Sequence, residues 1–64
     1  MVKINGKNLD IAGKSVSDYL NLAGYDLMRV AVELNGDIVP KWRYAETVFN
    51  EDDSVEVVSF VGGG

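Results

Sequence analysis

The sequence predicts an α+β fold, in which a mixed sheet of four to five strands carries one main helix packed on one face. Stretches of alternating apolar and polar residues lie on both sides of one stretch with helical spacing, and short turn signals separate them. The chain has 64 residues, which suffice for one domain with one core. Its hydrophobic fraction of 47% and charged fraction of 25% are typical of a soluble, folded protein.

The first predicted element is a β-hairpin at the N-terminus. Apolar residues alternate with polar ones on both sides of the stretch NGK, at Val2, Ile4, Leu9 and Ile11. A period of two residues on both sides of a turn that contains glycine is typical of two antiparallel strands. We therefore expect this segment to form two short paired strands.

A single amphipathic helix of about nine residues is predicted next, beginning after Ser15. The Ser15 side chain can accept a hydrogen bond from the backbone three residues on, and Asp18 favours the positive end of the helix, which is a capping-box pattern. Gly24 can adopt the left-handed conformation that ends a helix. Between these signals, apolar residues stand at helical spacing at Val16, Tyr19, Leu20 and Ala23.

The second predicted hairpin is centred on Asn35-Gly36, a dipeptide that is the strongest short hairpin signal when apolar residues alternate around it. Pro40 ends the second strand, because proline has no N–H to donate to a strand ladder. The stretch from 41 to 49 has no clean period, and we expect an irregular crossing loop there, with room for a 3₁₀ turn and with Trp42 as its anchor. The apolar residues of the hairpin are Val30, Val32, Leu34, Ile38 and Val39.

The last predicted strand contains the sequence VEVVSFV, which is rich in β-branched and aromatic residues. If Val55 and Val57 face the helix, the alternation exposes Val58 and Phe60 on the opposite side. These two side chains would form an apolar surface for a partner protein. The alternative is that the loop with Trp42 folds over them. We expect the buried core to include Ile4, Val16, Leu20, Val32 and Val57.

The order hairpin, helix, hairpin, loop and strand is that of a β-grasp fold. A helix that connects two strands of one sheet makes a right-handed crossover and covers one face of that sheet. Nothing in the sequence covers the other face, which leaves that face available for partners. We assign residues 1–61 to the β-grasp domain and residues 62–64 to a flexible C-terminal glycine tail.

The composition excludes several kinds of chemistry. Without Cys or His, the chain has no thiol nucleophile, no Cys-based metal site and no imidazole base, so we expect neither catalytic nor metal-binding residues. The net charge of −4 and the scattered Lys and Arg residues argue against nucleic acid as a partner. No apolar run approaches a membrane span and no signal peptide is present, so we expect a cytoplasmic protein. We interpret the acidic run Glu51-Asp52-Asp53 as a solvated turn, because it lacks the spacing of a calcium loop.

The sequence ends on Gly62, Gly63 and Gly64. One interpretation is a frayed terminus or a cloning remnant. The other is that residues without a Cβ let an extended chain thread a narrow channel, roughly 10 Å beyond the last strand. The terminal carboxylate is then the reactive group of the protein.

Four features together resemble the ThiS family of sulfur carriers in thiamine biosynthesis, which belongs to the ubiquitin-like β-grasp superfamily. They are the short length, the start VKINGK, the hairpin LNGDIVP and the end VEVVSFVGGG. The resemblance implies that a ThiF-type enzyme consumes ATP to adenylate the carboxylate of Gly64. It further implies that a cysteine desulfurase system supplies the sulfur that converts this group to a thiocarboxylate, which the thiazole synthase ThiG then uses.

The same resemblance assigns the other candidate residues. It implies that Gly62 and Gly63 are a flexible lead and that Val58 and Phe60 are the partner-binding surface. The protein would then be a cosubstrate rather than an enzyme, would bind no cofactor itself and would be a monomer when free. Two alternatives stay open: the small subunit of molybdopterin synthase, which uses the same tail chemistry, and a β-grasp binding module without tail chemistry.

Overall fold

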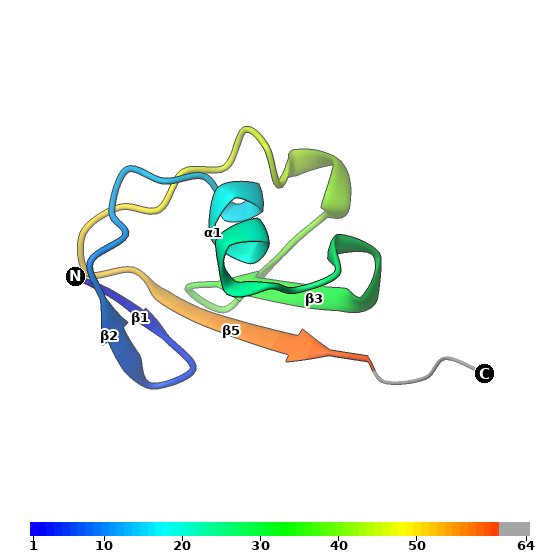
Figure 1. Ribbon diagram of the computed structural model, residues 1–64. Helices are drawn as coiled ribbons and strands as arrows, with labels where there is room; N and C mark the ends of the chain where they lie inside the picture. Colours follow the sequence, from blue (N-terminus) through cyan, green and yellow to red (C-terminus); the bar gives the residue numbers. More distant parts are fainter. Residues whose placement is uncertain (61–64) are drawn as a thin grey trace.

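The computed structural model describes residues 1–60, which form one five-stranded mixed sheet and one α-helix (Figure 1). The strands are β1 (Val2–Ile4), β2 (Lys7–Leu9), β3 (Val30–Leu34), β4 (Asp37–Val39) and β5 (Ser54–Ser59), and the helices are α1 (Val16–Ala23) and the 3₁₀ helices η1 (Leu27–Arg29) and η2 (Lys41–Arg43). The order in the sheet is β2-β1-β5-β3-β4, so the last strand lies in the centre. β5 runs parallel to β1, and the other neighbouring strands are antiparallel.

The helix α1 lies across one face of this sheet, between the N-terminal hairpin and β3 in the chain (Figure 1). This arrangement confirms the predicted α+β, β-grasp fold, with five strands in the sheet. The predicted boundary between domain and tail, at residues 61 and 62, lies outside the described residues. No helix in residues 1–60 is long and apolar enough to cross a membrane.

Both hairpins turn on an Asn-Gly dipeptide with the same backbone conformation. The φ angles are 51° at Asn5 and 83° at Gly6, and 51° at Asn35 and 88° at Gly36. Positive φ at both central residues defines the type I′ turn, whose twist matches that of the flanking strands. The turn chemistry therefore fixes the register of both hairpins, and both predictions are confirmed.

The predicted end signals of α1 are also confirmed. The Ser15 hydroxyl accepts a hydrogen bond from the backbone N–H of Asp18 at 3.1 Å, and Gly24 ends the helix at φ 85°. The helix buries Val16, Tyr19 and Leu20 against the sheet. Ala23, which we placed on the same apolar stripe, is exposed because the helix ends there.

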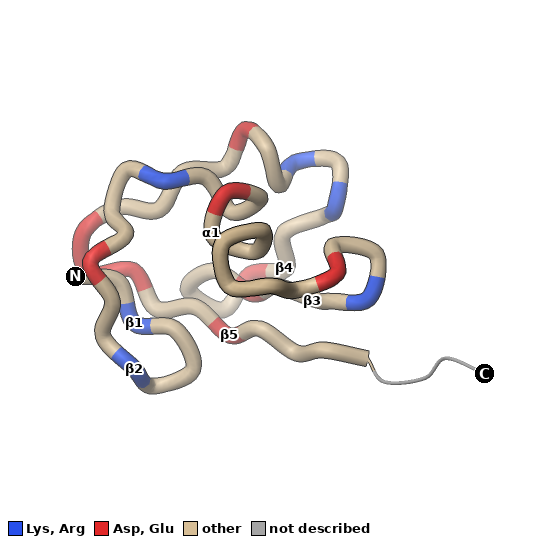
Figure 2. The backbone as a smooth tube through the Cα atoms, viewed as in Figure 1, with Lys and Arg blue, Asp and Glu red and all other residues tan. Residues whose placement is uncertain are grey.

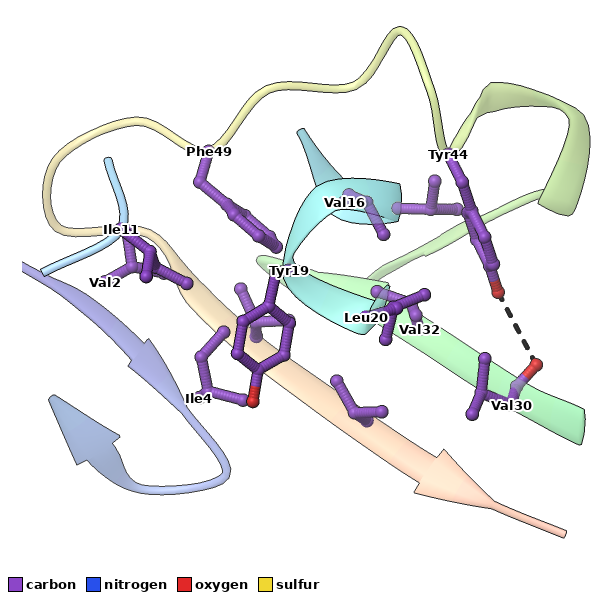
Figure 3. Packing of buried hydrophobic residues seen from close by; sticks show 13 residues of the cluster. Val2, Ile4, Ile11, Val16, Tyr19, Leu20, Val30, Val32, Tyr44 and Phe49 are labelled. Atoms are coloured by element: carbon purple, nitrogen blue, oxygen red, sulfur yellow. Dashed lines mark hydrogen bonds between the residues drawn. The ribbon is translucent and has the colours of Figure 1, made fainter. Parts of the chain in front are cut away.

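All five predicted core residues are buried between α1 and the sheet (Figure 3). The structure adds a side chain that we did not predict, Phe49, which is only 1% exposed. Its ring meets Tyr19 edge to face, with 6.1 Å between the ring centroids. The complete core is Val2, Ile4, Ile11, Val16, Tyr19, Leu20, Val30, Val32, Val39, Tyr44, Phe49, Val55 and Val57.

The crossing segment from 41 to 49 corrects one prediction. Trp42 is 77% exposed and does not anchor this segment; its ring instead lies 5.7 Å from the guanidinium carbon of Arg43. The anchors are Tyr44 and Phe49, both of which point into the core (Figure 3). The Tyr44 hydroxyl makes a long hydrogen bond of 3.5 Å to the carbonyl oxygen of Val30.

The crossing segment also supplies backbone partners for the start of α1. The N–H of Val16 donates to the carbonyl of Thr47 at 2.8 Å, and the N–H of Ser17 donates to the carbonyl of Tyr44 at 3.0 Å. The first N–H groups of a helix have no partner within the helix itself. An irregular segment therefore satisfies the helix N-terminus and is held in place by the same bonds.

Candidate functional site

The chain leaves the domain from the central strand of the sheet. β5 lies between β1 and β3, and it points toward the end of the molecule at which the described chain stops (Figure 1). Phe60 follows β5 and still donates its N–H to the carbonyl of Arg29, at 2.7 Å. The backbone is therefore hydrogen-bonded up to the last described residue, through Arg29 at the end of η1, directly before β3.

Side-chain alternation along β5 is as predicted. Val55 and Val57 are 1% and 7% exposed, whereas Val58 and Phe60 are 55% and 53% exposed. The alternative, in which the loop with Trp42 covers them, is wrong because that loop packs on the α1 side of the sheet. Val58 and Phe60 are thus free to contact another protein, and their role as a partner-binding surface stays a prediction.

The sheet face opposite α1, which we call the open face, extends beyond these two residues. In the pairing of the central strands, Ala31 lies opposite Val58, Glu33 opposite Glu56, and Ile38 opposite Glu33. Ile38 is 75% exposed. The central members of the open face are therefore Ala31, Glu33, Ile38, Glu56, Val58 and Phe60.

The open face combines apolar and acidic side chains with Lys3 of β1, which alternates with the buried Val2 and Ile4 and lies opposite Ser54 of β5. The strands β3, β4 and β5 carry acidic residues and contain no Lys or Arg (Figure 2). Sequence reasoning identified Val58 and Phe60 but missed Ile38 and the two glutamates. The signal for Ile38 and Glu33 was present, because a two-residue Asn-Gly turn places Asp37 opposite Leu34 and hence Ile38 opposite Glu33.

Asn5 holds β5 in position beyond the end of β1, a role that the sequence did not reveal. Its side-chain amide donates to the carbonyl of Val57 at 3.1 Å and accepts from the N–H of Val57 at 2.8 Å. These bonds resemble a strand ladder, although Asn5 is already in the turn. They give the N–H and the carbonyl of Val57 hydrogen-bond partners beyond the end of β1, just before Val58, and so hold the last part of β5 in place.

The acidic run at residues 51 to 53 lies before β5, at the opposite end from Phe60. The carboxylate of Asp53 accepts hydrogen bonds from the Asn35 side chain at 2.9 Å and from the N–H of Asn50 at 2.7 Å. Glu51 forms an ion pair with the N-terminal amino group. The interpretation as a solvated turn is therefore incomplete, since Asp53 joins the second hairpin to the start of β5.

The two buried tyrosines have environments that suit packing rather than proton transfer. Burial raises the pKa of Tyr44 above its usual value, and burial together with the neighbouring Tyr25 raises the pKa of Tyr19. A phenol is already neutral near pH 7, and burial moves the pKa of both tyrosines further from that pH, whereas an acid–base catalyst needs a pKa close to the working pH. The remaining predicted site residues, Gly62, Gly63 and Gly64, lie outside the described residues.

A mixed sheet crossed by one helix, with its last strand central and leading out of the domain, defines a small β-grasp protein of the ubiquitin-like class. The sequence model of the ThiS family matches residues 2–64. The sulfur carrier protein ThiS of Bacillus subtilis is 40% identical over an alignment of 68 positions, which covers 100% of both chains. The chain therefore belongs to the ThiS family.

A solved structure and a longer relative extend the comparison. The crystal structure of the thiamine biosynthesis protein ThiS from Geobacter metallireducens matches with a TM-score of 0.77 at 31% identity, covering 98% of this chain and 97% of that one. A thiazole synthase of Paramagnetospirillum magneticum is 44% identical over 62 residues, which are 95% of this chain. This chain spans only 19% of the length of that relative.

Proposed function

We propose that this protein is the sulfur carrier of thiazole formation in thiamine biosynthesis, with the carboxylate of Gly64 as the site that carries the sulfur. The observation that supports this most is that the ThiS family model matches through residue 64, so the glycine tail belongs to the matched pattern. The protein acts as a cosubstrate in the cytoplasm, is a monomer when free and binds no cofactor.

The tail chemistry requires activation by a partner enzyme. A carboxylate is a poor electrophile, because its negative charge is shared by two oxygens. One of these oxygens attacks the α-phosphorus of ATP and releases pyrophosphate, which leaves an acyl adenylate on Gly64. A donor at the oxidation level of sulfide then attacks the carbonyl carbon, and AMP departs with the former carboxylate oxygen. The net change is one oxygen replaced by sulfur.

The proposed partners follow from these steps. A ThiF-type adenylating enzyme binds the tail and ATP. A cysteine desulfurase supplies persulfide sulfur, which a thiol reduces to the level of sulfide, and a thiazole synthase accepts the sulfur from the carrier. Thiazole synthase receives further support, because a relative with that name contains a stretch similar to nearly this whole chain. That relative also favours the thiazole acceptor over the molybdopterin alternative.

The geometry at the end of β5 suits this role. Four residues follow Phe60 in the sequence, and an extended chain of four residues spans at most about 14 Å. Any enzyme that acts on the Gly64 carboxylate must therefore approach Phe60 closely. Val58 and Phe60 are exposed at this point and are the proposed docking surface. Gly62 and Gly63 form the thin lead that enters the active site of the partner.

The experiment is an adenylation assay with a ThiF-type enzyme, in which pyrophosphate release is measured with ATP and this protein. The parent protein is expected to support release. A variant without Gly64 draws the carboxylate back by about 3.5 Å, and a variant with one added residue moves it forward by the same distance, so both should lose most of the rate. Gly63→Val should also fail, because a branched side chain does not fit a channel shaped for glycine.

Controls separate lost chemistry from lost folding. All three variants change only residues beyond Phe60, so their circular dichroism and thermal midpoints should equal those of the parent. If the extended and valine variants are adenylated as fast as the parent, the terminal glycines do not serve as a reactive tail. Pyrophosphate release with the adenylating enzyme of molybdopterin synthesis, but not with the ThiF-type enzyme, would instead favour the small subunit of molybdopterin synthase.

A further inference from the structure

Two glutamates face each other across the middle of the open face. Glu33 of β3 lies directly opposite Glu56 of β5, and both side chains are exposed. Neither takes part in any of the ion pairs within residues 1–60. Like charges at directly opposite positions destabilise a pair of strands. The free protein therefore carries an unfavourable pair in the centre of its sheet.

Apolar residues flank this acidic pair on two sides. Two positions further along the same two strands, Ala31 lies opposite Val58, and on the neighbouring strand Ile38 lies opposite Glu33. Ile38 and Val58 are 75% and 55% exposed. The open face thus offers an apolar surface with two carboxylates inside it that form no ion pair within residues 1–60, and Lys3 of β1 faces the same side, opposite Ser54.

We infer that the open face binds a surface of thiazole synthase that places an arginine between Glu33 and Glu56 and an apolar side chain against Val58 and Ala31. This inference rests on the function proposed above and specifies the docking surface. A guanidinium is planar and has five N–H donors, so one group can serve two carboxylates at once. The binding partner then removes a repulsion that the free protein contains, and the charge of the pair selects for a cationic partner.

The position of the pair relative to the tail supports this occupant. Glu56 lies two residues before Val58 on the same face of β5, and Phe60 follows with the same alternation. The tail spans at most about 14 Å beyond Phe60, so an enzyme that reaches the carboxylate of Gly64 necessarily lies near this face. Thiazole synthase is chosen among the proposed partners because a longer relative with that name contains a stretch that is similar to nearly this whole chain.

The inference predicts opposite effects of one substitution on stability and on binding. Glu33→Gln and Glu56→Gln preserve shape and remove one charge of the repelling pair, so each should raise the thermal midpoint of the free protein. Each should also weaken binding to thiazole synthase by about tenfold or more, because a charge-assisted hydrogen bond is lost. Since both carboxylates serve the same cation, the double variant should lose less affinity than the product of the two single losses.

The experiment uses the full chain and measures the affinity for thiazole synthase by calorimetry, at several salt concentrations. Asp10→Asn is the matched control, since Asp10 is exposed, lies after β2, and has a side chain that forms none of the side-chain hydrogen bonds or ion pairs of residues 1–60. It should leave affinity unchanged, although it changes net charge equally. The affinity of the parent should also fall more steeply with salt than that of the double variant.

Four results would overturn the inference. Unchanged affinity of both glutamine variants would show that the pair is not part of the docking surface, while the proposed function stands. If Asp10→Asn weakens the affinity equally, the effect comes from the net charge and not from the position of the two glutamates. If the glutamine variants bind the adenylating enzyme more weakly but bind thiazole synthase as the parent does, the open face serves a different partner. If the parent does not bind thiazole synthase at all, the proposed acceptor itself fails.

Discussion

Phe49 is the largest side chain that the fold buries completely, and its replacement by Ala should remove much of the stability of the domain. The side chain is 1% exposed and packs edge to face on Tyr19. Truncation of a buried Phe to Ala costs about 3 to 5 kcal/mol, from lost burial and from the cavity that is left. A domain of 64 residues has a total unfolding free energy of about 3 to 10 kcal/mol.

Phe60→Ala provides the matched control for this prediction. The chemical change is identical, but Phe60 is 53% exposed, so the loss of buried apolar surface corresponds to about 1 kcal/mol or less. The two phenylalanines therefore separate burial from composition within one chain.

The assay is urea denaturation followed by circular dichroism, since Trp42 is exposed and its fluorescence responds weakly to unfolding. With a slope of about 1 kcal/mol per molar urea for a small domain, Phe49→Ala lowers the midpoint by about 3 M or leaves the chain unfolded without urea. Phe60→Ala lowers it by about 1 M at most. If Phe49→Ala stays within the range of the Phe60 control, the crossing segment does not anchor the core as described.

Three further predictions concern the docking surface, the helix start and the tyrosines. Phe60→Asp should leave the circular dichroism spectrum intact and weaken binding to the adenylating enzyme or thiazole synthase; unfolding of this variant would assign Phe60 to the core. Ser15→Ala should lower stability by about 1 kcal/mol in the same urea assay, because the N–H of Asp18 loses its capping acceptor, and an unchanged midpoint would contradict that role. Burial raises the pKa of Tyr19 and Tyr44 above 10.0, so the folded state holds these protons more tightly than the unfolded chain. The contribution of these tyrosines to stability should therefore be level below pH 10 and fall as the pH rises beyond it. Tyr44→Phe should make that fall shallower. A stability that rises with pH in this range would mean that folding lowers the pKa of these groups instead of raising it.

The parts of the fold that the sequence predicted are those with local signals. The Asn-Gly turns, the Ser15 cap and the Gly24 end each depend on residues within a few positions of one another. The exposure of Val58 and Phe60 also followed from alternation along one strand, once Val55 and Val57 were placed in the core. These features were predictable because the chemistry that fixes them lies in a short stretch of chain.

The parts that the sequence did not predict depend on contacts between distant segments. Trp42 has the larger ring, but Tyr44 and Phe49 are the residues that the crossing segment turns toward α1, and no periodicity between 41 and 49 indicates this. The amide of Asn5 bonds to Val57, 52 positions away. The opposition of Glu33 and Glu56 likewise requires the pairing of β3 with β5, which the sequence alone does not specify.

The most direct test is the intact mass of the protein after incubation with the ThiF-type enzyme, ATP, a cysteine desulfurase with cysteine, and a thiol that reduces the persulfide sulfur to the level of sulfide. The account predicts a gain of about 16 Da, the difference between sulfur and oxygen, located by fragmentation on Gly64. The variant with one residue added after Gly64 is expected to keep its original mass. An unchanged mass of the parent protein, or a gain of sulfur on any residue other than Gly64, would contradict the assignment of this chain as a sulfur carrier.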